Sequence, residues 1–153
     1  LMLLVGQDAV EFNRACAAHG AADAFLRFSP LMDESMLLGS GADGTRGLFV
    51  AASFFSSLVG ANAMELTGRY HDLHGPTAPP LSGIAESCYE GLQLLSRLIH
   101  RSGQLTDIAT SDRVSYDGPR GTVHYRADAT VQPVHLAVAD GYDFDVLTTL
   151  TAF

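Results

Sequence analysis

The distribution of apolar and polar residues along the chain predicts strands that are each followed by a helix. Residues 1–5 form a continuous apolar run, which is typical of a strand buried on both faces of a parallel sheet. Gly6 ends the run, and Asp8 with Glu11 three residues later has the pattern of a capped helix start. Gly20 is placed to end that helix. The segment therefore has the order of the first half of a βαβ unit.

The next segments repeat this order. The alternation of residues 25–29 predicts a short strand, and Asp33 is placed to cap a short helix after it. Residues 39–47 are rich in glycine and are predicted as a loop. Residues 48–52 form a second buried strand, and the spacing of apolar residues over 57–74 suits a helix.

The longest helix is predicted over residues 82–101. Ser82 is its N-cap and Gly103 its C-cap. Apolar residues recur at helical spacing within it: Ala85, Cys88, Tyr89, Leu92, Leu95, Leu98 and Ile99. This stripe is expected to face the core.

The last third of the chain changes to hairpins. Residues 116–121 form a turn cluster, and residues 122–127 and 131–139 alternate as strands. Asp140-Gly141 is a hairpin signal, with residues 142–147 as the returning strand. The pattern as a whole predicts an α/β fold of three layers, with a mostly parallel sheet and an antiparallel C-terminal hairpin extension.

Composition and charge narrow the function. The 153 residues are 47% hydrophobic and 17% charged, which is enough apolar material for a packed core. The net charge is −8, and all nine basic residues are arginines, so nucleic-acid binding is not expected. No segment has the apolar length that spans a bilayer. Cys16 and Cys88 are far apart in helical patterns and are interpreted as small buried side chains.

Two motifs with known chemistry fail on their context. Residues 39–44 match the dinucleotide pattern G-x-G-x-x-G, but a helix precedes them and a strand follows, which inverts the order that phosphate binding needs. His71 and His74 share a helix face, but a zinc site needs a third ligand. A solvated helix end is the favoured interpretation. No metal or cofactor is therefore expected.

The remaining candidates are polar residues at the expected carboxyl ends of the strands, where open α/β sheets bind their ligands. They are Gln7 and Asp8 after the first strand, Asp33 and Glu34 with Met32 after the second, and Ser53 with Phe54 and Phe55 after the third. Helix capping or packing is the alternative role for each of them, and Asp8 in particular is interpreted as a cap.

Four segments of the chain resemble one branch of a known family. They are residues 4–15, 29–34, 85–91 and 116–123, the last with its following hairpin. Together they are similar to the amide- and urea-binding branch of the type I periplasmic binding proteins. That branch includes urea-binding proteins of ABC transporters and amide-sensing negative regulators of aliphatic amidase operons. The resemblance runs in order over essentially the whole chain.

The resemblance implies a two-lobed α/β clamp that closes over a small ligand. Family proteins are about twice this length, so the chain corresponds to the C-terminal half of such a clamp. Residues 1–78 resemble the core of the second lobe, and residues 79–128 the segment that crosses back to the first. Residues 129–153 resemble the return to the second lobe. The N-terminal lobe of the same protein is then expected as a partner.

The resemblance also implies a non-catalytic role for the site residues. A small amide, urea or amino-acid-like molecule would bind between the lobes, with Glu34, Ser53 and Tyr89 facing the cleft. With Asp33 and Gln7, these are the expected ligand-binding residues. For Tyr89, packing on the core side of its helix is an equal alternative.

The sequence leaves two cellular locations and one alternative function possible. A transporter-linked protein would work outside the cytoplasm beside a permease, and an amidase regulator would work in the cytoplasm with a regulatory protein. An exposed lobe surface would also favour self-association. The rival is a small α/β enzyme that uses Asp33 and Glu34, or His71 and His74.

Overall fold

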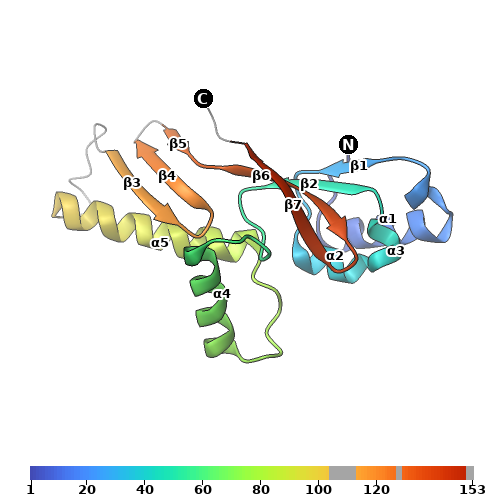
Figure 1. Cartoon of the computed structure of the whole chain (residues 1–153), viewed down its shortest axis with the longest axis horizontal. Helices are drawn as coiled ribbons and strands as arrows, with labels where there is room; N and C mark the ends of the chain where they lie inside the picture. The colour runs from blue at the N-terminus through green and yellow to red at the C-terminus, as the bar shows by residue number, and fades with distance from the viewer. Residues whose placement is uncertain (104–112, 127–128, 151–153) are drawn as a thin grey trace.

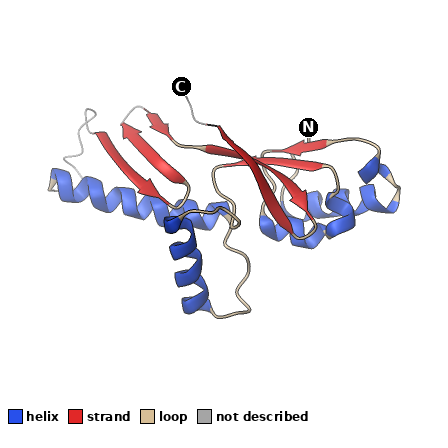
Figure 2. Cartoon of the chain, viewed as in Figure 1, coloured by secondary structure: helices blue, strands red, loops and turns tan. Residues whose placement is uncertain are grey.

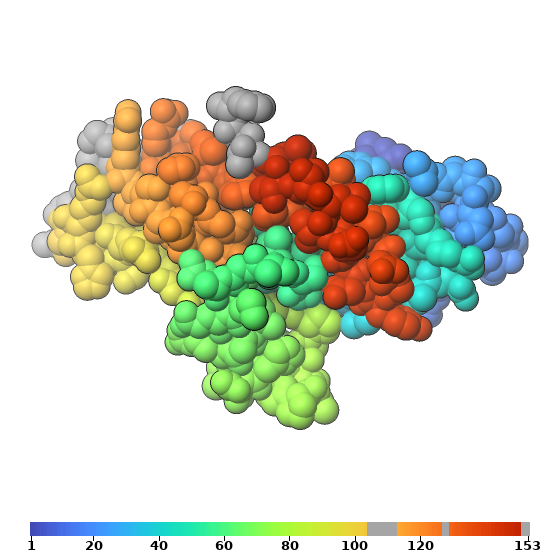
Figure 3. All heavy atoms as spheres, in the orientation of Figure 1, coloured from blue at the N-terminus to red at the C-terminus, as the bar shows by residue number. Residues whose placement is uncertain are grey.

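The computed structural model describes residues 1–103, 113–126 and 129–150, which form two parts side by side along the long axis of the molecule (Figures 1 and 3). One part holds a four-stranded sheet with the helices of the first 45 residues, and is called the four-stranded part. The other holds a three-stranded sheet with the helices of residues 61–102, and is called the three-stranded part. The α/β class is thus confirmed.

The four-stranded sheet has the order β1-β2-β6-β7. Its strands are β1 (Arg27–Ser29), β2 (Leu48–Ala52), β6 (Val134–Asp140) and β7 (Asp143–Leu150). The β1–β2 pair is parallel, and the β2–β6 and β6–β7 pairs are antiparallel. The predicted β2 strand and the C-terminal hairpin at Asp140-Gly141 are confirmed.

Short helices pack against this sheet (Figure 1). They are α1 (Gly6–Ala18), the 3-10 turn η1 (Ala21–Asp23), α2 (Glu34–Ser40) and α3 (Ala42–Thr45). The core between helices and sheet is built from apolar side chains, chiefly Met2, Ala9, Met32, Leu37, Leu48, Val50, Phe55, Ala137 and Phe144.

The three-stranded part consists of α4 (Ala61–His74), α5 (Gly83–Ser102), β3 (Arg113–Gly118), β4 (Gly121–Arg126) and β5 (Ala129–Val131). Its strands are antiparallel in the order β3-β4-β5, and they lie along α5 (Figure 2). A second, smaller core joins α4 to the start of α5 through Phe54, Ala63, Leu66 and Leu81. None of the helices in the described ranges is both long and apolar enough to cross a bilayer.

The prediction of a fully buried strand over residues 1–5 is wrong, because these residues form no strand and most of them are exposed. Met2 is buried and donates its N–H to the carbonyl of Phe28, at 2.8 Å, while Leu1, Leu3 and Val5 are exposed. The segment lies beside the edge strand β1 with one side covered. The helix start is also different, because Val5 occupies the N-cap position and Asp8 lies inside the first turn.

Three local boundaries also differ from the predictions. The glycine-rich segment 39–47 is mostly helical, since α2 continues to Ser40 and α3 follows at once. The helix expected from residue 57 begins at Ala61. The expected turn 116–121 is narrower, because β3 and β4 pair up to Gly118 and Gly121 and only two residues connect them. The predicted end of the next strand at residue 127 lies outside the described residues.

The long helix α5 is confirmed in its extent, but its buried face is not the predicted one. Ser82 caps it by accepting the N–H of Ala85 at 3.3 Å, and Gly103 ends it. Its buried residues are Glu86, Glu90 and Leu98, and Cys88 is exposed. Of the predicted stripe, Leu98 is buried and Tyr89 and Ile99 are half-buried, while Ala85, Cys88, Leu92 and Leu95 are exposed.

Candidate functional site

A cleft of about 600 Å³ lies between the two parts, at the carboxyl ends of β1 and β2. The four-stranded part contributes Val5, Gly6 and residues 30–36 and 52–54 to its walls. The three-stranded part contributes the first turns of α5, with Gly83, Ile84 and Ser87. The cleft is thus lined by both parts and by the starts of α1, α2 and α5.

The wall at α2 is fixed by two acidic residues. The Asp33 carboxylate accepts the N–H of Met36 at 2.9 Å and so caps α2. Glu34 is 4% exposed, and its Oε1 accepts the N–H of Ser56 at 2.7 Å. Burial raises the pKa of the Glu34 carboxyl above its ordinary value. The pair therefore joins α2 to the segment that follows β2.

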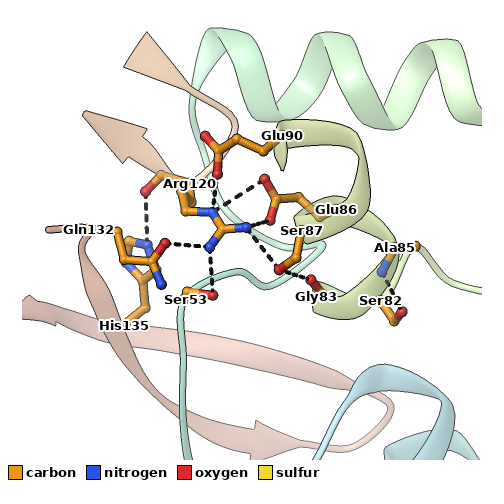
Figure 4. A network of polar contacts seen from close by, with 10 residues as sticks. All are labelled: Ser53, Ser82, Gly83, Ala85, Glu86, Ser87, Glu90, Arg120, Gln132 and His135. Carbon is orange, nitrogen blue, oxygen red and sulfur yellow. Dashed lines mark hydrogen bonds and ion pairs between the residues drawn. The ribbon is translucent and has the colours of Figure 1, made fainter. Parts of the chain in front are cut away.

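A buried arginine lies behind the cleft and contacts two residues of its wall (Figure 4). Arg120, from the turn between β3 and β4, is 6% exposed and contacts Glu86 and Glu90 on α5. Its guanidinium also donates to Ser53 at 3.2 Å and to Ser87 at 3.0 Å. Because both hydroxyls border the cleft, the arginine network holds part of the cleft wall in place.

Arg120 forms ion pairs with two buried carboxylates, so the cluster has one more acidic than basic side chain. Glu86 and Glu90 are both buried, and Glu90 Oε1 has no hydrogen-bond partner among the residues that the structure describes. Burial is the largest cause that raises the pKa of Glu90 to about 7, and the neighbouring Glu86 raises it further, while Arg120 lowers it. Burial of the nearby Tyr116 side chain raises the pKa of its hydroxyl to about 12.

Glu90→Gln is expected to reduce the pH dependence of stability. Between pH 4.5 and 7 the folded protein keeps the Glu90 proton, while an unfolded chain loses it. The free energy of unfolding therefore falls as the pH rises through this window. Urea titrations from pH 5 to 8 should show a flatter profile for Glu90→Gln than for the wild type.

The control for this variant is Glu65→Gln, because Glu65 is an exposed residue of α4 that pairs with Arg69 at 3.6 Å. Its profile should follow that of the wild type. Identical slopes for Glu90→Gln and the wild type would mean that Glu90 titrates as an ordinary carboxyl.

The structure brings three of the five sequence-predicted ligand residues together. Asp33, Glu34 and Ser53 line the cleft. Gln7 instead donates to Glu11 at 3.0 Å on the exposed surface of α1. Tyr89 lies away from the cleft on α5, where its hydroxyl accepts from Gln93 at 2.8 Å.

The residues of the rival enzyme hypothesis have other contacts. The rings of His71 and His74 lie 5.7 Å and 4.8 Å from the ring of Tyr70. Within residues 1–103, 113–126 and 129–150, no group of three or more metal-binding side chains comes together. Asp33 and Glu34 are engaged with backbone N–H groups, as described above.

Sequence reasoning missed Arg120 and its partners on α5. The sequence predicts a turn at residue 120 and gives Glu86 and Glu90 no role of their own. Their four-residue spacing put them on one helix face, which was the only local signal. An arginine that pairs across 30 or more positions leaves no pattern in the sequence.

Comparison with known families gives one match, to the family described as periplasmic binding protein, over residues 1–141. The chain belongs to the periplasmic binding protein family. No curated protein sequence matches it.

Solved structures of the same fold agree with this assignment. An amino acid ABC transporter substrate-binding protein from Pseudomonas fluorescens Pf-5 superposes with a TM-score of 0.81 at 15% identity, over 98% of this chain and 43% of that one. A solute-binding protein from R. palustris in complex with benzoate superposes with a TM-score of 0.78 at 19% identity, over 97% of this chain and 42% of that one. A third structure is a leucine-, isoleucine-, valine-, threonine- and alanine-binding protein from Brucella ovis in a closed conformation. It superposes with a TM-score of 0.76 at 19% identity, over 95% of this chain and 41% of that one. The chain thus spans less than half of each of these proteins.

Proposed function

We propose that this periplasmic-binding-protein chain forms one wall and part of the hinge of a solute-binding protein, which closes over a small organic molecule without a chemical step. The observation that carries the proposal is the cleft between the two parts at the carboxyl ends of β1 and β2. The described chain passes between the parts at residues 53–60 and again at residues 132–133. Rotation about such crossings is the usual way in which two lobes close on a ligand.

The lining of the cleft favours a solute with an apolar body and an N–H donor. Leu31, Met32, Phe54 and Ile84 supply an apolar surface. Glu34 is a carboxylate in this apolar wall, and it suits an ammonium or amide N–H. Among the solutes that the resemblance implied, these features favour an amino-acid-like molecule or an amide with an apolar group over urea.

Two further groups suit an acceptor oxygen on the same solute. The Ser53 hydroxyl borders the cleft. The first turn of α1 begins there as well; its N-cap Val5 makes no side-chain capping bond among the described residues, and the Gly6 N–H donates to Met36 Sδ at 3.0 Å. Backbone N–H groups at a helix start favour a carboxylate or carbonyl oxygen. An amino acid carries both the donor and the acceptor.

The outward face of α5 supports a second lobe as the partner. Ile84, Cys88, Leu92 and Leu95 form one stripe along the helix, and Ile84 and Leu92 are 75% and 69% exposed. An apolar stripe of this length is normally covered. We assign its cover to an α/β lobe equivalent to the larger share of the matched structures that this chain does not span. Self-association through the stripe is the alternative.

The packing of α4 refines the proposed division of the chain. Because α4 shares a core with the start of α5 and contacts β3, we place the first crossing between β2 and α4, earlier than residue 79. The return crossing lies between β5 and β6, close to the predicted residue 129. Residues 104–112, 127–128 and 151–153 lie outside the described chain. The closed protein would deliver its solute to a transporter permease.

The test measures binding by the full-length protein that contains this segment. Isothermal titration with L-leucine, acetamide, urea and benzoate is expected to give the tightest binding for L-leucine. Glu34→Gln should then weaken L-leucine binding at least tenfold, because the ammonium loses a charged partner, and should change acetamide binding less than threefold.

Glu11→Gln, an exposed change on α1, should leave all four affinities unchanged. Binding of none of the four compounds would argue against the proposed function. Equal losses for L-leucine and acetamide in Glu34→Gln would contradict the assigned role of Glu34.

A further inference from the structure

We infer that Arg120 is a positioning residue of the hinge: it ties both chain crossings to α5 and holds the Ser53 hydroxyl at the cleft as a donor to the solute. The inference rests on the proposed function for the solute and on the contacts alone for the hinge. Figure 4 shows the guanidinium at the centre of side chains that come from separate segments of the chain.

All five N–H groups of the guanidinium have acceptors. Nε donates to Glu90, and Nη2 donates to Glu86 and Ser87 on α5. Nη1 donates to Ser53 at 3.2 Å and to Gln132 at 2.6 Å. Only the planar fork of arginine offers five donors in fixed directions, since lysine has three on a single rotating ammonium.

The two acceptors of Nη1 lie on the two crossings. Ser53 directly follows β2, where the chain leaves the four-stranded sheet, and Gln132 lies between β5 and β6, where the chain returns to it. Glu86, Ser87 and Glu90 all lie on α5. One side chain therefore fixes the start of the outgoing crossing and the return crossing to the same helix.

The main chain of Arg120 is held by the opposite part. His135 on β6 lies with Nε2 at 3.2 Å from the Arg120 carbonyl and Nδ1 at 2.9 Å from the Thr149 hydroxyl. A carbonyl only accepts, so Nε2 carries the hydrogen and Nδ1 accepts from Thr149. Arg120 thus contacts both parts, with its backbone on the four-stranded sheet and its side chain on α5.

The hydrogen bond from Arg120 also determines whether the Ser53 hydroxyl can act as a donor or an acceptor toward a solute. Its oxygen already accepts from Arg120, and the described residues supply no acceptor for its proton. Ser87, by comparison, donates to the carbonyl of Gly83 at 2.7 Å. Ser53 is therefore the hydroxyl that remains as a donor, and a solute that binds here presents a carboxylate or carbonyl oxygen to it.

The first arm of the test needs no solute. Hydrogen–deuterium exchange with mass spectrometry is carried out on the solute-free, full-length protein. Arg120→Lys is expected to speed amide exchange at least tenfold in peptides covering residues 53–58 and 131–134. Arg69→Lys, an exposed change on α4, should leave both within twofold of the wild type.

Two milder variants keep the inference testable if Arg120→Lys does not fold. Ser53→Ala should speed exchange only at 53–58, and Gln132→Ala only at 131–134, because each removes one acceptor and leaves the guanidinium in place. Unchanged exchange in both, or in a folded Arg120→Lys, would overturn the hinge role.

The second arm uses L-leucine as the probe. Ser53→Ala and Arg120→Lys should each weaken its binding about tenfold, while Ser53→Thr, which keeps the hydroxyl, should stay within threefold. The double variant Ser53→Ala/Arg120→Lys should bind no more weakly than Arg120→Lys alone. Additive losses would show that Arg120 does not act through Ser53. If the wild type does not bind L-leucine, the proposed amino-acid ligand fails, and the exchange arm still decides the role of Arg120.

Discussion

Replacing Arg120 by alanine is expected to lower the free energy of unfolding by about 3–5 kcal/mol at pH 8. The substitution leaves two buried carboxylates, Glu86 and Glu90, without their only cationic contact among the described residues. It also removes donors to Ser53, Ser87 and Gln132. Removing one partner of a buried ion pair costs more free energy of unfolding than the intact pair contributes, because the remaining charge stays buried without a partner.

Urea unfolding followed by circular dichroism measures this loss. Arg69→Ala is the matched control, since its side chain is 68% exposed, and the expected change is below about 1 kcal/mol. The loss in Arg120→Ala should shrink at pH 5, because the Glu90 carboxyl, with a pKa of about 7, is then protonated. A loss that is equal at pH 5 and pH 8 would contradict the electrostatic explanation.

Replacing Phe144 by alanine is expected to cost about 3–5 kcal/mol, mainly through lost apolar contact and a residual cavity. Phe144 lies on β7 and is 1% exposed. Its ring centroid is 5.0 Å from that of Phe55, which lies on the outgoing crossing. The side chain therefore stabilises both the sheet and the start of that crossing.

The control is Tyr142→Ala in the same hairpin, because Tyr142 is 65% exposed. Its free energy of unfolding should change by less than about 0.5 kcal/mol. Phe144→Leu should lose less than Phe144→Ala, as it keeps most of the buried volume. Equal stability of Phe144→Ala and Tyr142→Ala would mean that this core is not under the β6–β7 hairpin.

Short-range chemistry explains the elements that the sequence predicted well. Asp33 caps α2 and Ser82 caps α5 because each carboxylate or hydroxyl reaches an N–H only three residues ahead. The β6–β7 hairpin forms around Asp140-Gly141, where Gly141 has a φ of +67°. Of the predicted site residues, Asp33, Glu34 and Ser53 line the cleft because each follows a strand end.

The predictions that failed concern which side of an element is covered. Residues 1–5 were expected to be buried on both faces, and Leu1, Leu3 and Val5 are exposed. On α5 four residues of the predicted core stripe, Ala85, Cys88, Leu92 and Leu95, are exposed, and Glu86 and Glu90 are buried with Leu98. Periodicity shows that a helix has two different faces, but burial depends on which neighbour packs against it.

The sequence alone determined most of the strands and helices, the caps of α2 and α5, the net negative charge and the family resemblance, because these depend on residues within a few positions of one another or on simple counts. Tertiary structure alone decided that Arg120 would contact Glu86, 34 positions away, and that Ser53 and Ile84 would share one cleft. Hydrogen bonds and ion pairs act over a few ångströms, and the distance between remote residues is set only when the whole chain has folded.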